Sequence, residues 1–176
     1  MNDTPHALSS SRTLWELVTR RAALTPDRPL FLQDGRTLTF EALRARAERV
    51  AAGLYGMGVR PGTVVAWQLP TRIETVVLSF ALARLGAVQS PVIPFYRDRE
   101  VGFALRESKA EFFAVPGVWR GFDHTEMARR LVASREKVNR KLHEWVRQGW
   151  VEIASVGVRL KVPDRLRTLA GGLDVR

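Results

Sequence analysis

Between residues 14 and 116 the sequence alternates two kinds of segment, and this alternation limits the possible folds more than any other feature. Apolar residues that recur every three or four positions predict helices over about 14–24, 40–57, 74–85 and 99–108. Short apolar runs between the later helices, "TVVAWQL", "AVQSPVI" and "EFFAVP", predict buried strands. Helices that alternate with buried strands indicate a layered α/β fold.

Local signals mark the boundaries of these elements. The Asp34-Gly35 pair inside "PLFLQDGRTLTF" is typical of a tight β-hairpin turn. Thr39 is placed to cap the helix that follows it, and Gly86 to end the helix before it. For the first two helices, the spacing predicts that the following residues face the core: Leu14, Leu17, Val18 and Ala22, and then Leu43, Ala47, Val50, Ala51 and Leu54.

Four stretches of the chain carry a likeness to a known family. They are "LTFEAL", "GLYGMGVRPGTVVAWQLPTRIE", "ALARLGAVQSPVIPFYRDREVGFAL" and "VPGVWRGFDHTEMARRL". Over residues 1 to about 131 the chain resembles the N-terminal part of the adenylate-forming acyl-CoA synthetases, which are AMP-dependent ligases, and within them the ligases for cyclic carboxylic acids. The resemblance implies a truncated, layered α/β segment of the synthetase N-terminal domain.

The same resemblance implies that the ligase chemistry lies elsewhere. The family binds ATP with a Ser/Thr/Gly loop that leads to Pro-Lys-Gly, an aromatic-Gly-x-Thr-Glu segment and a ribose-binding Asp, and it uses a catalytic Lys near its C-terminus. None of these motifs occurs in the sequence. The charge that develops on the leaving pyrophosphate would therefore have no positioned cation here. We expect no catalytic residues, no cofactor and no enzyme activity from the chain as it stands.

Basic residues become denser after Phe122, and a second pattern appears there. On a helical wheel the segment after Ser134 separates a polar face from an apolar one. Its polar face contains Arg135, Glu136, Asn139 and Arg140, side chains that suit guanine, cytosine and adenine edges in a DNA groove. Ser134 is a credible N-cap. After the helix, "WVEIASVGVRLKVP" predicts two short strands about a turn at Gly157.

This tail resembles the winged helix-turn-helix domain of the cyclic-AMP-receptor type of transcription regulator. That family has an "SRExVxR" recognition helix followed by "xxGxIE" and a wing, and the chain matches it in "SREKVNR" and "QGWVEI". The resemblance implies DNA contacts, to bases and phosphates, by Ser134, Arg135, Glu136, Asn139, Arg140, Lys141 and Arg159. On charge pattern alone, however, an ordinary solvated amphipathic helix is the commoner explanation of such a segment.

These observations divide the chain into residues 1–124, an incomplete acyl-CoA-synthetase-like segment, and residues 125–176, a winged helix-turn-helix. The resulting interpretation is a transcription-regulator-type protein that binds double-stranded DNA through its tail. Two alternatives remain: an acyl-CoA synthetase fragment with no DNA role, or a fusion relic without a function. A homodimer and complementing ligase domains are the possible protein partners.

Several kinds of site are not expected. The sequence has no cysteine, and its histidines, His6, His124 and His143, are too scattered for a zinc site. Asp123 and His124 are adjacent, but no nucleophile is placed near them, so we expect a loop histidine rather than an acid/base pair. Charges and prolines interrupt the most apolar stretch, which predicts no membrane anchor and a cytoplasmic protein.

Overall fold

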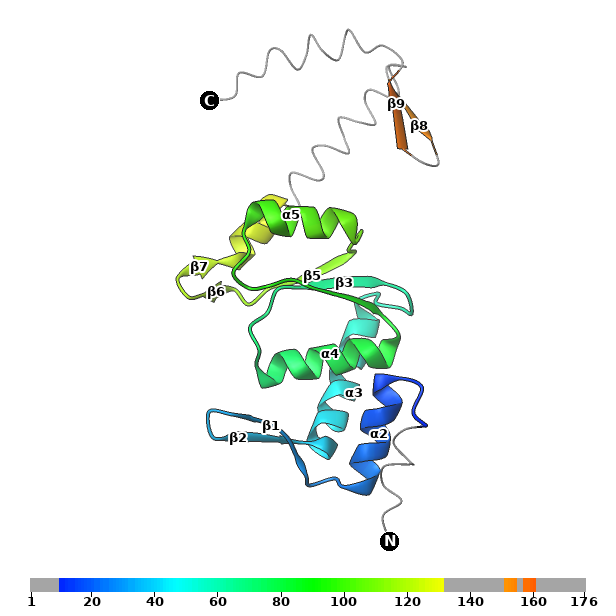
Figure 1. Cartoon of the computed structure of the whole chain (residues 1–176), viewed down its shortest axis with the longest axis vertical. Helices are drawn as coiled ribbons and strands as arrows, with labels where there is room; N and C mark the ends of the chain where they lie inside the picture. The colour runs from blue at the N-terminus through cyan, green and yellow to red at the C-terminus, as the bar shows by residue number, and fades with distance from the viewer. Residues whose placement is uncertain (1–9, 132–150, 155–156, 161–176) are drawn as a thin grey trace. The chain divides into compact units, whose positions relative to one another are not determined.

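The computed structural model describes residues 10–131, 151–154 and 157–160 (Figure 1). The chain divides into two compact units, Met1–Met127 and Ala128–Arg176, and each is considered by itself. Among the described residues, none of the helices is long and apolar enough to cross a membrane.

The first unit begins with two helices that are connected in the sequence by a β-hairpin. Helix α2 (Leu14–Leu24) is capped by Thr13, whose hydroxyl accepts the Glu16 amide at 3.0 Å. Helix α3 (Phe40–Gly56) begins at the predicted cap, because the Thr39 hydroxyl accepts the Ala42 amide at 3.2 Å. Each hydroxyl satisfies one of the amides that a helix N-terminus leaves without an intrahelical acceptor.

The predicted hairpin is confirmed. Strands β1 (Pro29–Gln33) and β2 (Arg36–Thr39) pair antiparallel, with an irregularity between Pro29 and Phe31. Asp34 and Gly35, which join them, have φ values of 49° and 73°. Two successive positive φ angles match the twist of a two-residue hairpin turn, and Asp-Gly is a favoured pair for that turn.

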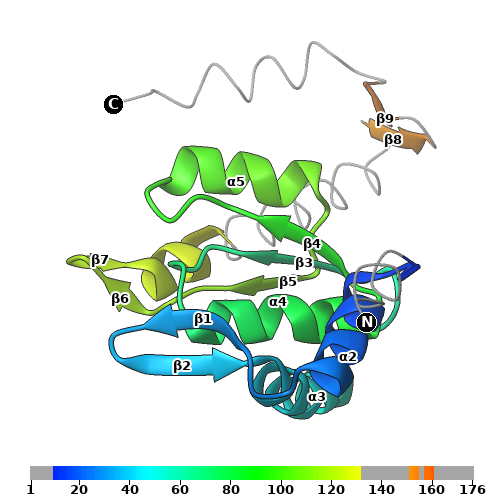
Figure 2. The same cartoon turned by 60° about the horizontal axis from the view of Figure 1, so that its bottom comes forward.

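A three-stranded parallel sheet follows. Its strands are β3 (Val64–Trp67), β4 (Val88–Pro91) and β5 (Phe112–Ala114), in the spatial order β4-β3-β5. Helix α4 (Ile73–Leu85) connects β3 to β4, and helix α5 (Asp98–Glu107) connects β4 to β5. Figure 2 shows α4 and α5 on opposite sides of the sheet. The predicted α/β architecture is therefore confirmed for this unit.

The main core lies where α2, β2, α3 and α4 meet. Its buried members are Val18, Leu38, Leu43, Ala47, Ala51, Ile73, Val77 and Ala81. The inward face of the first helices is narrower than the spacing predicts, because Leu14 and Leu17 are 59% and 38% exposed and Val50 is exposed as well. Small residues such as Ala22 and Ala47 occupy the buried positions and allow the helices to approach closely.

An ion pair links the hairpin to α4. The Arg36 guanidinium of β2 lies 3.0 Å from the carboxylate of Glu74, in the first turn of α4. The backbone amide of Glu74 and this guanidinium both lower the pKa of the Glu74 carboxyl. Both side chains are more than half exposed, so the pair adds orientation more than stability.

After β5 come a small hairpin, β6 (Val118–Trp119) and β7 (Phe122–Asp123), and helical residues 124–131. The first unit ends at Met127, within this helix. Asp123 caps that helix, because its Oδ1 accepts the Glu126 amide at 3.0 Å. His124 and Met127 of this helix are fully buried. The expectation of a loop histidine is therefore wrong: His124 belongs to a helix and is enclosed by protein.

In the second unit the structure describes one antiparallel pair, β8 (Val151–Ala154) and β9 (Gly157–Leu160). Gly157 begins the second strand, whereas the sequence placed it in the turn. Six of the predicted DNA contacts, Ser134, Arg135, Glu136, Asn139, Arg140 and Lys141, lie outside the described residues, and so does the side chain of Arg159. The predicted winged helix is not shown, and the boundary at residue 124 stays a prediction.

Candidate functional site

The candidate site is built around residues 92–97, the segment that joins β4 to α5, which we call the β4–α5 loop. Gln68, the residue after β3, is fully buried beneath it. Its Nε2 donates to the carbonyl oxygens of Ile93 and Tyr96, both at 2.9 Å. A single amide therefore holds two carbonyls of the loop.

Arg97 holds the loop from its other end, at the N-terminus of α5. Its Nη1 donates to the carbonyl oxygens of Pro94 at 3.2 Å and Tyr96 at 2.9 Å. The guanidinium also stacks over the Phe122 ring, with 4.0 Å from Cζ to the ring centroid. A cation over an aromatic face gains electrostatic energy, so this contact ties α5 to the β6–β7 hairpin.

His124 supplies the third connection. Its Nε2 lies 3.2 Å from the Pro94 carbonyl oxygen, and its Nδ1 lies 3.1 Å from the Phe122 carbonyl oxygen. A neutral imidazole has one N–H and can donate to only one of these oxygens, whereas an imidazolium can donate to both. The Phe122 ring meets the imidazole edge to face, with centroids 4.9 Å apart. His124 thus joins the small hairpin to the loop.

One atom beneath the loop is left unsatisfied. Within the part of the chain that the structure describes, Oε1 of Gln68 is buried and has no hydrogen-bond partner. An unpaired buried acceptor costs about 1–3 kcal/mol.

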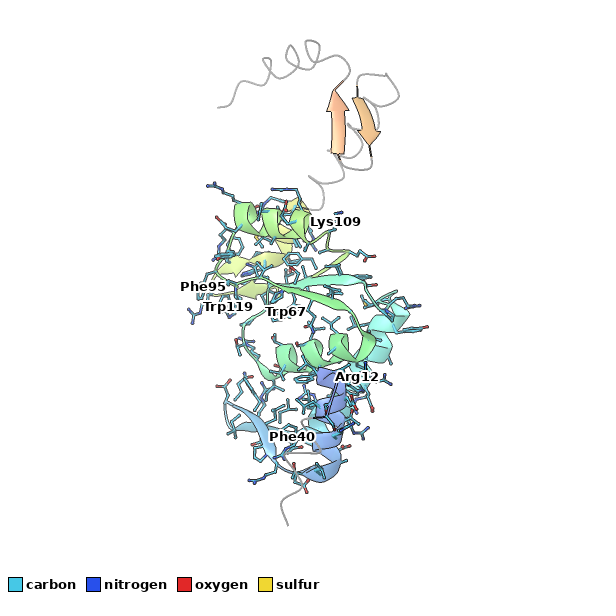
Figure 3. The ribbon with its side chains drawn as sticks, turned by 45° about the vertical axis from the view of Figure 1, so that its right-hand side comes forward. Arg12, Phe40, Trp67, Phe95, Lys109 and Trp119 are labelled. Carbon is cyan, nitrogen blue, oxygen red and sulfur yellow. The ribbon has the colours of Figure 1, made fainter. Side chains whose placement is uncertain are left out.

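With its carbonyls held inward, the loop presents apolar side chains outward. Ile93, Phe95 and Tyr96 are 52%, 59% and 43% exposed. Phe95 packs against Trp119, with ring centroids 5.3 Å apart, and Figure 3 shows the two side chains next to one another. Arg120 lies over both rings. The loop therefore carries exposed aromatic side chains on a backbone that is held in place by hydrogen bonds.

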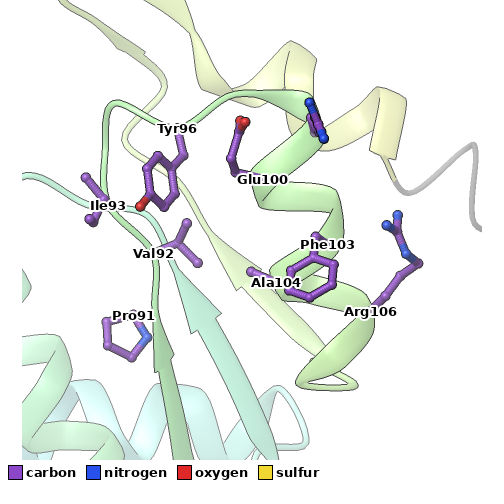
Figure 4. A pocket seen from close by; sticks show the side chains of 9 residues that line it. Pro91, Val92, Ile93, Tyr96, Glu100, Phe103, Ala104 and Arg106 are labelled. Atoms are coloured by element: carbon purple, nitrogen blue, oxygen red, sulfur yellow. The ribbon is translucent and has the colours of Figure 1, made fainter.

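A pocket of about 670 Å³ separates this loop from α5 (Figure 4). Val92, Ile93 and Tyr96 line it from the loop, and Phe103 and Ala104 line it from α5. Pro91, at the end of β4, closes one side, and Arg99, Glu100 and Arg106 add charge. The pocket combines apolar walls with a predominantly basic group of side chains, a composition that suits an apolar partner carrying carboxylates.

The pocket adjoins an edge of the sheet. Among the described strands, β4 pairs with β3 alone, so its other side is an open edge. Parallel strands are ordinarily covered on their faces and continued by further strands. An open edge of this kind is a template for another strand.

The described residues do not bring together a metal-binding group. No cluster of three or more His, Asp or Glu side chains that could hold a metal occurs among them. The side chains of the predicted DNA-contacting residues lie outside the described residues. Gln68, Arg97 and His124 were not predicted as a site. Gln68 and His124 bond to carbonyls that lie 25 or more residues away in the sequence, and Arg97 bonds to carbonyls next to it. No local sequence pattern marks either kind of contact.

A sequence model described as the AMP-binding enzyme family matches residues 18–161. The chain is 38% identical over 120 residues to triostin synthetase I of Streptomyces triostinicus. This match covers 68% of the chain and 23% of that protein. It is also 38% identical over 129 residues to the salicyl-AMP ligase / salicyl-S-ArCP synthetase of Mycobacterium tuberculosis (strain ATCC 25618 / H37Rv). That match covers 70% of the chain and 23% of the relative. The chain thus spans about a quarter of these relatives.

The fold agrees with these matches. The structure is similar to that of a putative long-chain-fatty-acid CoA ligase from Rhodopseudomonas palustris CGA009, with a TM-score of 0.63 and 32% identity. That similarity covers 72% of this chain and 31% of the other. The resemblance of the first unit to the N-terminal part of the ligases is confirmed.

The interpretation as a DNA-binding transcription regulator is wrong. The family match extends through residues 134–141 and through Arg159, the positions assigned to DNA contacts, and the similar proteins are ligases and a synthetase. A basic amphipathic segment is compatible with many surface helices, so its charge pattern did not discriminate between them. The alternative interpretation, a ligase fragment, fits better. The chain belongs to the AMP-binding enzyme family.

Proposed function

We propose that these residues form the N-terminal scaffold of an adenylate-forming ligase that activates aromatic carboxylic acids. The observation that carries the proposal is the 38% identity to the salicyl-AMP ligase / salicyl-S-ArCP synthetase. A 2-hydroxy-7-methoxy-5-methyl-1-naphthoate–CoA ligase of Streptomyces carzinostaticus is 31% identical over 131 residues and supports the same substrate class.

The reaction of such a ligase joins a carboxylate oxygen to the α-phosphorus of ATP and releases pyrophosphate. Positive charge and backbone amides must stabilise the phosphates as the bond to pyrophosphate breaks. The sequence contains none of the family's ATP-binding motifs, and its four lysines, Lys109, Lys137, Lys141 and Lys161, lie in none of the expected contexts. We therefore propose that catalysis requires residues beyond these 176, supplied by a complementary ligase part.

Carboxylate-dependent exchange of pyrophosphate into ATP tests this proposal. We expect no exchange from the 176-residue chain alone. We also expect exchange from a chimera in which residues 18–131 replace the corresponding part of the M. tuberculosis salicyl-AMP ligase. This chimera should prefer salicylate to a medium-chain fatty acid.

Two results would contradict the proposal. Exchange by the chain alone would mean that it contains the catalytic residues. A folded chimera without exchange would mean that residues 18–131 are not an equivalent scaffold. The unaltered salicyl-AMP ligase serves as the positive control.

A further inference from the structure

We infer that His124 is a proton-dependent clamp on the β4–α5 loop. As an imidazolium, His124 donates one hydrogen bond to the Pro94 carbonyl oxygen of that loop and one to the Phe122 carbonyl oxygen of the β6–β7 hairpin. Loss of one proton leaves one of these carbonyls without its donor, so the ring fixes the loop to the hairpin less tightly as the pH rises. The inference goes beyond the proposed function and does not depend on the substrate of the ligase.

The positions of the two ring nitrogens carry the argument. Nε2 lies 3.2 Å from the Pro94 oxygen, and Nδ1 lies 3.1 Å from the Phe122 oxygen. A carbonyl oxygen only accepts hydrogen bonds, whereas a neutral imidazole has one nitrogen with a hydrogen and one with a lone pair. The neutral ring would therefore direct a lone pair at one of the two oxygens. The imidazolium satisfies both contacts.

Turning the ring over does not remove this conflict. A half-turn about the Cβ–Cγ bond exchanges Nδ1 with Cδ2 and Nε2 with Cε1, so carbon–hydrogen groups would face both oxygens. Such groups are weaker donors than N–H groups. His124 is fully buried, so bulk water does not reach the ring to replace a lost hydrogen bond. The observed orientation is the one that can give each carbonyl an N–H donor.

Burial and hydrogen bonding act in opposite directions on the charge of this ring. A buried imidazolium loses its hydration, which disfavours the charged form. Hydrogen bonds from a charged donor are about twice as strong as neutral ones, and here the negative ends of two carbonyl dipoles lie at the ring nitrogens. Because the neutral ring gives up one of the two bonds in a place without water, we expect the hydrogen bonds to decide the protonation state.

The charged side chains around the ring oppose one another. The titratable and charged groups on the neighbouring elements are Tyr96, Arg97, Asp98, Arg120, Asp123 and Glu126. Arg97 lies over the Phe122 ring and Arg120 over the Trp119 ring, and both rings are neighbours of the imidazole. These guanidiniums disfavour a proton on His124, whereas the carboxylates on either side of it in the chain favour one. The two carbonyl contacts remain the specific difference between the two protonation states.

Nuclear magnetic resonance of the full chain with isotope-labelled histidine tests the proton count directly. At about pH 6 both ring nitrogens of His124 should carry hydrogens that exchange slowly with water, and one of these should be lost as the pH is raised to about 9. A proton count that stays the same across this interval, whether one or two, would overturn the inference. Backbone connectivity assigns the His124 signals, so this result does not require any variant to fold.

Hydrogen exchange measures the effect on the loop. The Tyr96 amide donates to the Ile93 carbonyl at 3.1 Å and therefore reports the order of the loop. Relative to the unstructured rate at each pH, its protection should fall about two- to tenfold as His124 loses its proton. In His124→Gln, whose amide donates but does not titrate, this protection should not change with pH. The Thr25 amide, which donates to the Arg21 carbonyl at 2.9 Å, is the control within the same molecule and should be constant.

Arg97→Gln is the matched variant. Arg97 also donates to the Pro94 carbonyl, but a guanidinium keeps its charge throughout this interval. The substitution should weaken protection at Tyr96 at every pH and should keep the decrease with rising pH. Wild-type protection that does not depend on pH would overturn the inference, as would an equal decrease in His124→Gln. Neither result concerns pyrophosphate exchange, so failure of this inference and failure of the proposed function are distinguishable.

Discussion

Gln68 shows how one residue can organise a surface without touching solvent. Its Nε2 bonds to Ile93 and Tyr96 span 25 and 28 residues of sequence, so the amide fixes a distant segment. Before the structure is known, "WQLP" is the polar end of an apolar strand. Its role depends on which loop lies above β3, and a local pattern does not contain that information.

Replacing Gln68 by Met should therefore loosen the β4–α5 loop. The substitution keeps the side-chain length but removes one of two donors from each of the Ile93 and Tyr96 carbonyls, which keep the Tyr96 amide and the Arg97 guanidinium. The net cost should be about 0.5–1.5 kcal/mol in the free energy of unfolding. Urea denaturation measures this cost. Hydrogen exchange of the Tyr96 amide, which donates to the Ile93 carbonyl at 3.1 Å, should become faster.

A change of a half-buried glutamine outside the loop provides the control for that experiment. Gln33→Met alters a glutamine of β1 whose contacts lie outside the loop. It should leave exchange at Tyr96 unchanged. If Gln68→Met also left both stability and exchange at Tyr96 unchanged, the amide would not be what holds the loop.

At the scale of elements, most boundaries were predictable because their causes are local. The Thr39 cap, the Asp34-Gly35 turn and the glycine at the end of α4 all occur where the sequence predicts them. Each depends on the conformational preference of one or two residues. The buried faces of the helices were predicted less well, because the exposure of Leu14 and Leu17 depends on how many elements pack around α2.

Two glycine substitutions separate conformational strain from helix propensity. Gly86 ends α4 with φ of 67°, a left-handed conformation, and an added Cβ would meet Pro61 only at an ordinary 3.6 Å. Gly86→Ala should therefore destabilise the chain by about 1–2 kcal/mol through backbone strain rather than through a clash. Thermal or urea unfolding measures the difference.

Gly53→Ala is the matched comparison. Gly53 lies inside α3, and an added Cβ there would meet nothing within 4 Å. The substitution should stabilise the chain by about 0.5–1 kcal/mol, because alanine favours the helix. If both substitutions changed the free energy of unfolding in the same direction, the causes assigned to them would be wrong.

At the scale of the whole molecule, the core of the first unit should control its stability. Leu43 is fully buried among side chains from α2, β2, α3 and α4, so Leu43→Ala should cost about 2–5 kcal/mol. Leu32→Ala, at a position 73% exposed, should change stability by no more than about 0.5 kcal/mol. Urea unfolding of both variants checks this. A small effect of Leu43→Ala would mean that this core does not control unfolding.

Family membership was also predictable at this scale for the first unit, since whole stretches such as "ALARLGAVQSPVIPFYRDREVGFAL" carry it. The tail misled the interpretation. Arg135, Glu136 and Arg140 on one helical arc are consistent with DNA contact and with a solvated helix alike. The match of the AMP-binding enzyme family through these positions decides against the transcription-regulator interpretation.

The sequence by itself determined the alternation of helices and strands, their caps and turns, and the likeness to the ligases. These features follow from periodicity and from the preferences of neighbouring residues. Only the tertiary structure decided that β3 lies between β4 and β5, and that Gln68, Arg97 and His124 meet at one loop. Strand order and such convergence arise from packing between distant segments, and no local pattern specifies which segments will meet.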